Sequence, residues 1–195
     1  MNSRETILEA VLKNQPQTTL LPDISMFKGD NNSDDVQKYI DVFKTIGGSA
    51  FRVDDIAAVK AHIDEHFDVT KRLVTTLAEL NDIAELLSNA VDPHTYEDVE
   101  LAVIKAHFFV AENGAVWLTD QLMSQRVIPY ICQHLAVIVS AVSIVPTMHE
   151  AYEQIGTGDY GFGGFIGGPS KTADIEQALV LGAHGPLTMT VFIMK

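Results

Sequence analysis

The chain has 195 residues, a length typical of one domain, and its 47% hydrophobic and 20% charged residues exclude an intrinsically disordered protein. The formal net charge of −13 repels phosphate backbones, so we expect no nucleic-acid partner. The single cysteine, Cys132, excludes a disulfide framework and any cysteine-based metal or iron–sulfur site built by this chain alone, which predicts a reducing, cytoplasmic location.

The N-terminal segment predicts a helix from Ser3 to Lys13, with an apolar stripe on one face and a capping pair formed by Asn2 and Glu5. Because acidic residues are interspersed in it, this segment does not resemble a signal peptide. The following residues, 15–32, are rich in proline, glycine and asparagine and predict an irregular linker that crosses the body. We therefore divide the chain into a helix and linker, residues 1–32, and an α/β domain, residues 33–195.

The first half of this domain alternates helices with strands. Helices are predicted after Ser33, from Asp54 and over Asn81–Ala90, and strands over Ser49–Val53 and Arg72–Leu77. Short joints between such elements are typical of a parallel sheet covered by helices.

The second half is richer in strands. Asn113-Gly114 within the apolar stretch Leu101–Leu118 predicts a hairpin. Leu135–Val145 reads as a strand buried on both faces, and the apolar run here is too short to span a membrane. A helix with capping-box spacing begins near Thr147, Phe165-Ile166 ends a strand, and Thr188–Met194 is the last strand.

The glycine-rich stretch from Gly163 to Glu176 is the strongest candidate for a functional site. Gly167-Gly168-Pro169 predicts a turn, and Ser170-Lys171-Thr172 predicts the start of a helix whose free N–H groups bind a small anion. Asp174 and Glu176 would bind a cation or a hydroxyl group. The alternative is a plain turn in which Ser170 only caps the helix and the acidic residues only complement its dipole. Neither a phosphate-binding loop nor a dinucleotide-binding glycine pattern is present.

Other candidates lie at the hairpin and near the C-terminus. Glu112 places a carboxylate at the hairpin tip, where it would face the Gly168 turn, although a solvated hairpin fits the residues equally well. His184, beside a glycine, is a candidate ligand or acid–base group, with a structural role slightly favoured. His62 and His66 share a helix face, where solvation is favoured over metal binding, and Cys132 reads as a buried structural thiol. We predict no metal site.

Several of these motifs resemble one family. Gly168–Glu176 and Gly182–Pro186 resemble the C-terminal signature of the lactate-utilisation protein C family, also called the LUD domain. Ala111–Gly114 is similar to the family's hairpin, and Ile128-Pro129 before a strand is similar to its Leu-Pro. The sequence departs from the family where Lys171 replaces the usual arginine, Asn113 replaces threonine and Leu187 replaces a residue that is often basic.

The resemblance implies a NagB/RpiA/CoA-transferase-like fold, with a parallel-rich mixed sheet flanked by helices. It also implies a non-redox subunit of a system that oxidises L-lactate to pyruvate together with two iron–sulfur partner proteins, which would hold the clusters. The ligand-binding candidates are Asn113, Gly114, Gly167, Gly168, Ser170, Lys171, Thr172 and Glu176, and the catalytic candidates are Glu112, Asp174 and His184. Two alternatives remain. One is a stand-alone enzyme of this fold that acts on a phosphorylated sugar or an acyl-CoA. The other is an interaction module without activity.

Overall fold

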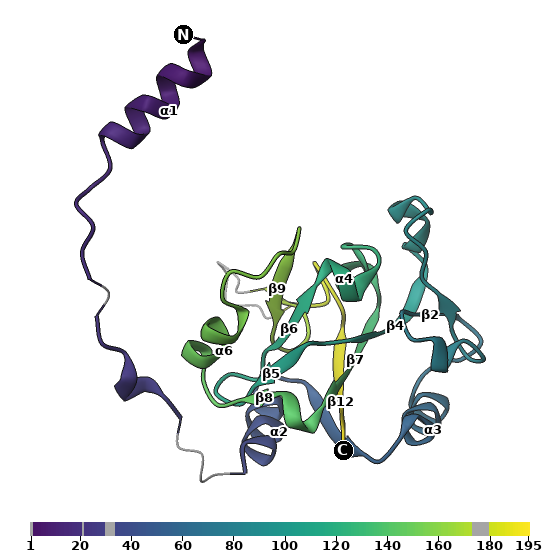
Figure 1. Cartoon of the computed structure of the whole chain (residues 1–195). Coiled ribbons are helices and arrows are strands. Elements are labelled where there is room, and N and C mark those ends of the chain that lie inside the picture. The colour runs from purple at the N-terminus through teal and green to yellow at the C-terminus, as the bar shows by residue number, and fades with distance from the viewer. Residues whose placement is uncertain (1, 21, 30–33, 173–179) are drawn as a thin grey trace.

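A parallel six-stranded sheet lies at the centre of the computed structural model, which describes residues 2–20, 22–29, 34–172 and 180–195 (Figure 1). The strand order is β1-β12-β7-β4-β2-β3, and every neighbouring pair is parallel. The strands are β1 (Ser49–Val53), β2 (Arg72–Thr75), β3 (Glu85–Leu86), β4 (Val99–Lys105), β7 (His134–Ser140) and β12 (Thr188–Met194). The parallel-rich sheet predicted from the alternation of elements is confirmed.

A smaller sheet packs beside the first, in the order β8-β5-β6-β9. Its strands are β5 (Phe108–Val110), β6 (Val116–Thr119), β8 (Ile144–Val145) and β9 (Gly163–Ile166), and two further short strands, β10 (Lys171–Thr172) and β11 (Val180–Leu181), pair with each other. β5 and β6 are antiparallel and are joined through Asn113-Gly114. The predicted hairpin is therefore confirmed.

Six α-helices and four 3-10 turns complete the described part of the chain. They are α1 (Ser3–Lys13), α2 (Asp35–Thr45), α3 (Ile56–His66), α4 (Asp120–Met123), α5 (Ile128–Ile131), α6 (Met148–Ile155), η1 (Ser25–Phe27), η2 (Ala78–Leu80), η3 (Pro93–Tyr96) and η4 (Ala141–Ser143). The helices predicted after Ser33 and from Asp54 are present as α2 and α3, and β1 and β12 match their predicted bounds.

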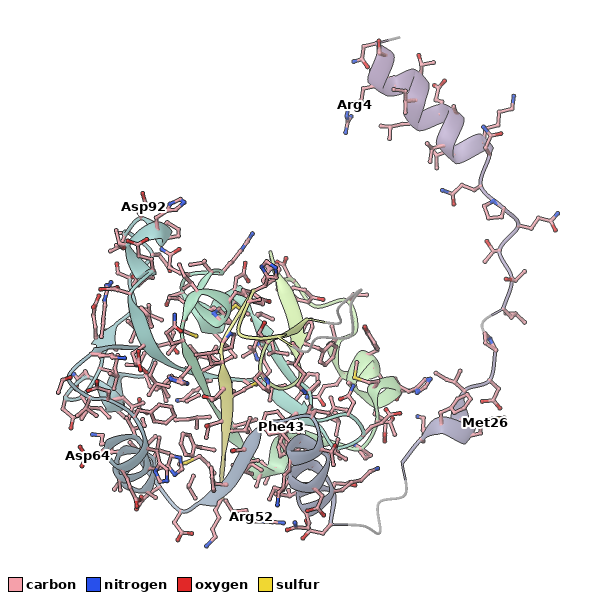
Figure 2. All side chains as sticks on the ribbon, turned by 180° about the vertical axis from the view of Figure 1, so that it is seen from behind. Arg4, Met26, Phe43, Arg52, Asp64 and Asp92 are labelled. Carbon is pink, nitrogen blue, oxygen red and sulfur yellow. The ribbon has the colours of Figure 1, made fainter. Side chains whose placement is uncertain are left out.

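Alternation along β4 divides the core into two layers. Ala102 and Ile104 point to the cluster that buries Tyr39 and Phe43 of α2, whereas Leu101 and Val103 join the cluster that buries one face of α3. Successive side chains of a strand point to opposite faces, so a central strand covered by helices on both sides must be apolar throughout. Figure 2 shows Phe43 on the side of α2 that meets the body.

The N-terminal arm stands away from this body (Figure 1). α1 has the predicted capping box but buries none of its residues. Residues 15–20, the first part of the linker predicted to cross the body over residues 15–32, are exposed. In Figure 2, Arg4 and Met26 both lie on the projecting arm. Phe27 stacks on His149 of α6 with ring centroids 5.0 Å apart, which anchors the arm where it reaches the body.

Two predicted elements outside the glycine-rich stretch are wrong. The helix over Asn81–Ala90 is replaced by a turn that follows η2 and by β3, because the Glu85 carboxylate pairs with the Arg72 guanidinium 2.9 Å away and extends the chain alongside β2. The single strand over Leu135–Val145 is broken by η4, and its last two residues cross to the smaller sheet as β8. No helix in the described ranges is long and apolar enough to cross a membrane.

Candidate functional site

The glycine-rich turn lies against the carboxyl end of α2. Gly168 and Pro169 are buried, and Gly168 has a φ of +80°, a conformation that side chains disfavour. A Cβ atom on Gly168 would sit 3.0 Å from the carbonyl oxygen of Ile46, the residue that caps α2. The turn therefore needs glycine in order to approach the helix end closely.

The helix predicted to begin at Ser170 is wrong for the residues that the structure describes. Lys171 and Thr172 form β10, which is antiparallel to β11. The Ser170 N–H donates to the carbonyl of Pro186 at 2.9 Å, and the Gly182 N–H donates to the carbonyl of Ser170 at 3.2 Å. The Ser170 amide, which was expected to bind an anion, is therefore already hydrogen-bonded to the later segment that contains Pro186. Asp174, Glu176 and the rest of the predicted helix lie outside the described residues.

Lys171 also contacts α2. Its ammonium group donates a hydrogen bond to the Ile46 carbonyl, just beyond the last residue of that helix. The carboxyl end of a helix carries partial negative charge and unpaired carbonyls, so a lysine there is stabilising. This contact gives Lys171 a structural role that the sequence pattern did not indicate.

The hairpin tip lies next to the turn through Asn113. The Asn113 carbonyl oxygen would be 3.9 Å from a Cβ atom on Gly167, and the Asn113 side chain accepts from the Ala115 N–H at 3.1 Å. The Glu112 carboxylate, however, accepts the Met148 N–H at 2.7 Å, at the start of α6. His184 is exposed. Ligand binding by these residues stays a prediction.

The carboxyl ends of three central strands form a cleft that sequence reasoning missed. A cavity of about 350 Å³ is lined by Lys105, Ser140 and Met194, the last residues of β4, β7 and β12. Ligands of open parallel sheets bind outside the carboxyl ends of the strands. The available signal was a polar residue directly after two of the buried apolar runs, Lys105 after Leu101–Ile104 and Ser140 after Leu135–Val139.

His107 is a candidate proton-transfer group that lines this cleft. Its Nε2 atom lies 2.7 Å from the hydroxyl of the buried residue Thr119, and partial burial lowers the pKa of His107 below its ordinary 6.5. The imidazole is therefore neutral near pH 7 and able to accept a proton.

Charged and hydroxyl groups complete the cleft wall. The Lys105 ammonium is 3.9 Å from the Glu79 carboxylate, with half of its side chain exposed, and the Ser143 hydroxyl donates to the Ser140 carbonyl at 2.7 Å. A cation held only loosely by its partner can accept a carboxylate ligand. The arrangement thus suits a small carboxylate beside a proton-transfer group.

The remaining candidate residues, His62, His66 and Cys132, make contacts typical of a structural role. The rings of His62 and His66 stack with centroids 4.1 Å apart, and across the described ranges no group of three or more His, Cys, Asp or Glu residues is placed to hold a metal ion. Cys132 is buried, which raises the pKa of its thiol to about 12.

Comparison with known proteins gives matches to one family. The LUD domain family model matches residues 94–194. Lactate utilization protein C of Geobacillus thermodenitrificans is 33% identical over 104 residues, which are 50% of this chain and 43% of that protein. Its counterpart in Bacillus pumilus is 30% identical over 97 residues, 47% of this chain and 40% of that protein. The chain thus spans less than half of the length of these curated relatives.

One solved structure has a similar fold. A DUF162 family protein from Deinococcus radiodurans superposes with a TM-score of 0.61 over 83% of this chain and 97% of that chain, at 14% sequence identity. This likeness confirms the α/β fold class.

Proposed function

The chain belongs to the LUD domain family, and from that premise we propose that it takes part in lactate utilisation, as a subunit that works beside iron–sulfur proteins. The observation that carries the proposal is the family match itself, because residues 94–194 include Lys105, His107, Ser140 and Ser143 of the strand-end cleft. Relatives at 30–33% identity carry the name Lactate utilization protein C.

The oxidation chemistry supports a division of labour. Conversion of L-lactate to pyruvate releases an electron pair and two protons, so an electron acceptor is required. Iron–sulfur clusters are held by several cysteine thiolates, whereas this chain has one cysteine, and burial keeps that thiol protonated. We assign the clusters to the partner proteins and ligand binding to this chain.

The cleft contains groups suited to bind that ligand and to accept a proton from it. The Lys105 ammonium would pair with the carboxylate of lactate or pyruvate, and the neutral imidazole of His107 would accept the proton of the lactate hydroxyl group. The C–H bond at the same carbon would break, with its electron pair passing to the acceptor held by the partner proteins and its proton to solvent. Lys105 is the last residue of β4 and His107 comes two residues later, so the buried sheet fixes the backbone near both residues. A site positioned by rigid strands keeps such groups in place.

The first test measures ligand binding by thermal shift with lactate, pyruvate, CoA and phosphosugars as separate probes. A ligand at 100 times its dissociation constant adds roughly 2.7 kcal/mol of stability. Lactate or pyruvate should stabilise the native chain, and Lys105→Met should abolish the effect. Lys28→Met is the matched control, because Lys28 is a half-exposed lysine paired with Glu153 far from the cleft.

The second test is growth on lactate by a strain in which this chain is replaced by its variants. Lys105→Met and His107→Gln should slow growth, whereas Lys28→Met should not. Normal growth with folded Lys105→Met and His107→Gln proteins would contradict the cleft assignment. Stabilisation by CoA or a phosphosugar, but not by lactate or pyruvate, would favour the stand-alone enzyme.

A further inference from the structure

Two more cavities lie near the cleft. A middle cavity of about 260 Å³ shares His107 with the cleft, and it shares Gln121, Asp159 and Tyr160 with an outer cavity of about 770 Å³. The middle and outer cavities therefore lie side by side, and together they are called the trough. Their sizes fall near or within the range of about 300–1,000 Å³ that small-molecule sites occupy.

The middle cavity has an aromatic wall. Trp117 and Tyr160 both line it, with ring centroids 5.6 Å apart in an edge-on arrangement, and Phe108 stacks on Trp117 at 6.3 Å. The side chains of Gln121 and Gln154 stand beside these rings. Aromatic faces together with amide donors and acceptors recognise a planar heteroaromatic ring.

Glycines in Gly158–Gly164 make this wall possible. A Cβ atom on Gly163 would lie 2.7 Å from the Trp117 ring and 2.9 Å from that of Tyr160. On Gly161 it would lie 2.8 Å from the guanidinium of Arg126 and equally close to the Asp120 carboxylate. This stretch, which matches no known nucleotide fingerprint in sequence, thus brings the aromatic rings and a cation to one surface.

The outer cavity supplies that cation. Arg126 donates to the Asp120 carboxylate at 2.8 Å and lies over the ring of Phe162, and 59% of its side chain is exposed. Among the described residues, Asp120 is its one recorded hydrogen-bond partner, so several N–H groups of the guanidinium remain for a ligand. Guanidinium groups bind phosphate through paired hydrogen bonds.

We propose that the middle and outer cavities together bind a nucleotide, with its base against the exposed ring of Tyr160, beside the buried Trp117, and its phosphate at Arg126. The carboxylates of Asp120 and Asp159 face the same trough and would accept hydrogen bonds from the ribose hydroxyl groups. This site is distinct from the lactate cleft and does not depend on the function proposed above.

Trp117 gives a direct readout, because it is the only tryptophan of the chain and it lines the middle cavity. AMP, GMP and UMP are titrated into the native chain while Trp117 fluorescence and calorimetric heat are recorded. We expect saturable quenching with at least one of the three. Ribose 5-phosphate, which has no ring, should bind far more weakly, and adenosine, which has no phosphate, should also lose affinity.

Matched variants locate the site. Tyr160→Ala and Arg126→Gln should each weaken binding by about 10-fold, the loss expected when one stacked ring or one charged contact is removed. Tyr152→Ala and Arg52→Gln are the controls, since Tyr152 is an exposed tyrosine and Arg52 is an arginine paired with one aspartate, both outside the trough. They should bind normally.

Three results would overturn the proposal. They are the absence of binding by all three nucleotides, equal losses in the control variants, and binding of ribose 5-phosphate as tight as that of AMP. Lys105→Met should leave nucleotide binding unchanged while it removes the response to lactate or pyruvate. Failure of the nucleotide site and failure of the lactate function are therefore distinguishable.

Discussion

The change Gly114→Ala tests whether the hairpin glycine is required for packing. Gly114 is buried at a φ of +75°, and a Cβ atom there would lie 2.9 Å from Cδ1 of Ile46 and 3.3 Å from the backbone Cα of Phe43. A residue with a side chain costs roughly 1 kcal/mol in this left-handed region, and overpacking adds roughly 1–3 kcal/mol. We expect a loss of about 2–4 kcal/mol.

The matched control is Gly47→Ala. Gly47 also has a positive φ, +86°, but the nearest atom to its added Cβ is 3.5 Å away, an ordinary contact distance, so only the backbone cost of about 1 kcal/mol applies. Both changes restrict the unfolded chain equally, so that contribution cancels in the comparison.

Urea unfolding followed by circular dichroism gives both free energies. For a chain of this size the Gly114→Ala loss corresponds to a fall in Tm of roughly 4–16 °C. Equal free energies of unfolding for the two variants would refute the close approach of the hairpin to α2.

Three further outcomes are expected. Lys171→Met should lower the unfolding free energy in urea by roughly 0.5–1 kcal/mol through loss of the helix-end contact, with unchanged growth on lactate; a growth defect in a stably folded variant would restore the anion-binding role. Ser124, at φ +57° and ψ −53°, is strained, so Ser124→Gly should raise the urea midpoint by an amount worth roughly 0.5–2 kcal/mol, and an unchanged or lower midpoint would contradict the strain. Burial lowers the pKa of His62, His107 and His134 below 6.5, and the His66 charge adds to the effect on His62. The unfolded chain then binds more protons, so stability should fall as the pH drops from about 7 to about 5; a urea midpoint that stays level over that interval would be inconsistent with these shifts.

The elements that were predicted correctly carry their signals locally. The side chains of Asn2 and Glu5 each accept a hydrogen bond from the other residue's backbone N–H across one turn. Gly47 ends α2 with a φ of +86°. The β-branched residues within Thr188–Met194 fit a strand buried on both faces. Such signals depend on residues that are close together in the sequence, so they can be recognised without knowledge of the tertiary structure.

The errors arise where distant segments decide the local conformation. Ser170-Lys171-Thr172 has the composition of a helix start, but pairing with Val180–Leu181 and the hydrogen bond from Ser170 to Pro186 hold it extended. The propensity of three residues is worth only a few tenths of a kcal/mol each, less than the pairing of two strands.

The strand-end cleft was missed because no single stretch of sequence contains it. Lys105, Ser140 and Met194 lie on three strands that are far apart in the chain, and only the parallel register brings their ends to one edge. A polar residue after an apolar run is a weak signal alone. It becomes specific once the strand order is known, since the edge then collects several such residues.

The signature motifs meet at one residue that none of them contains. Cδ1 of Ile46 would lie 2.9 Å from a Cβ on Gly114, 3.4 Å from one on Gly168 and 3.9 Å from one on Gly167, and its carbonyl accepts the Lys171 ammonium. Ile46 joins α2 to β1, so hairpin, turn and lysine together hold this corner against the smaller sheet. The motifs that identify the family therefore stabilise the packing of the fold at this corner. The cleft is formed by other residues, at the ends of the central strands, whose sequence pattern is much weaker.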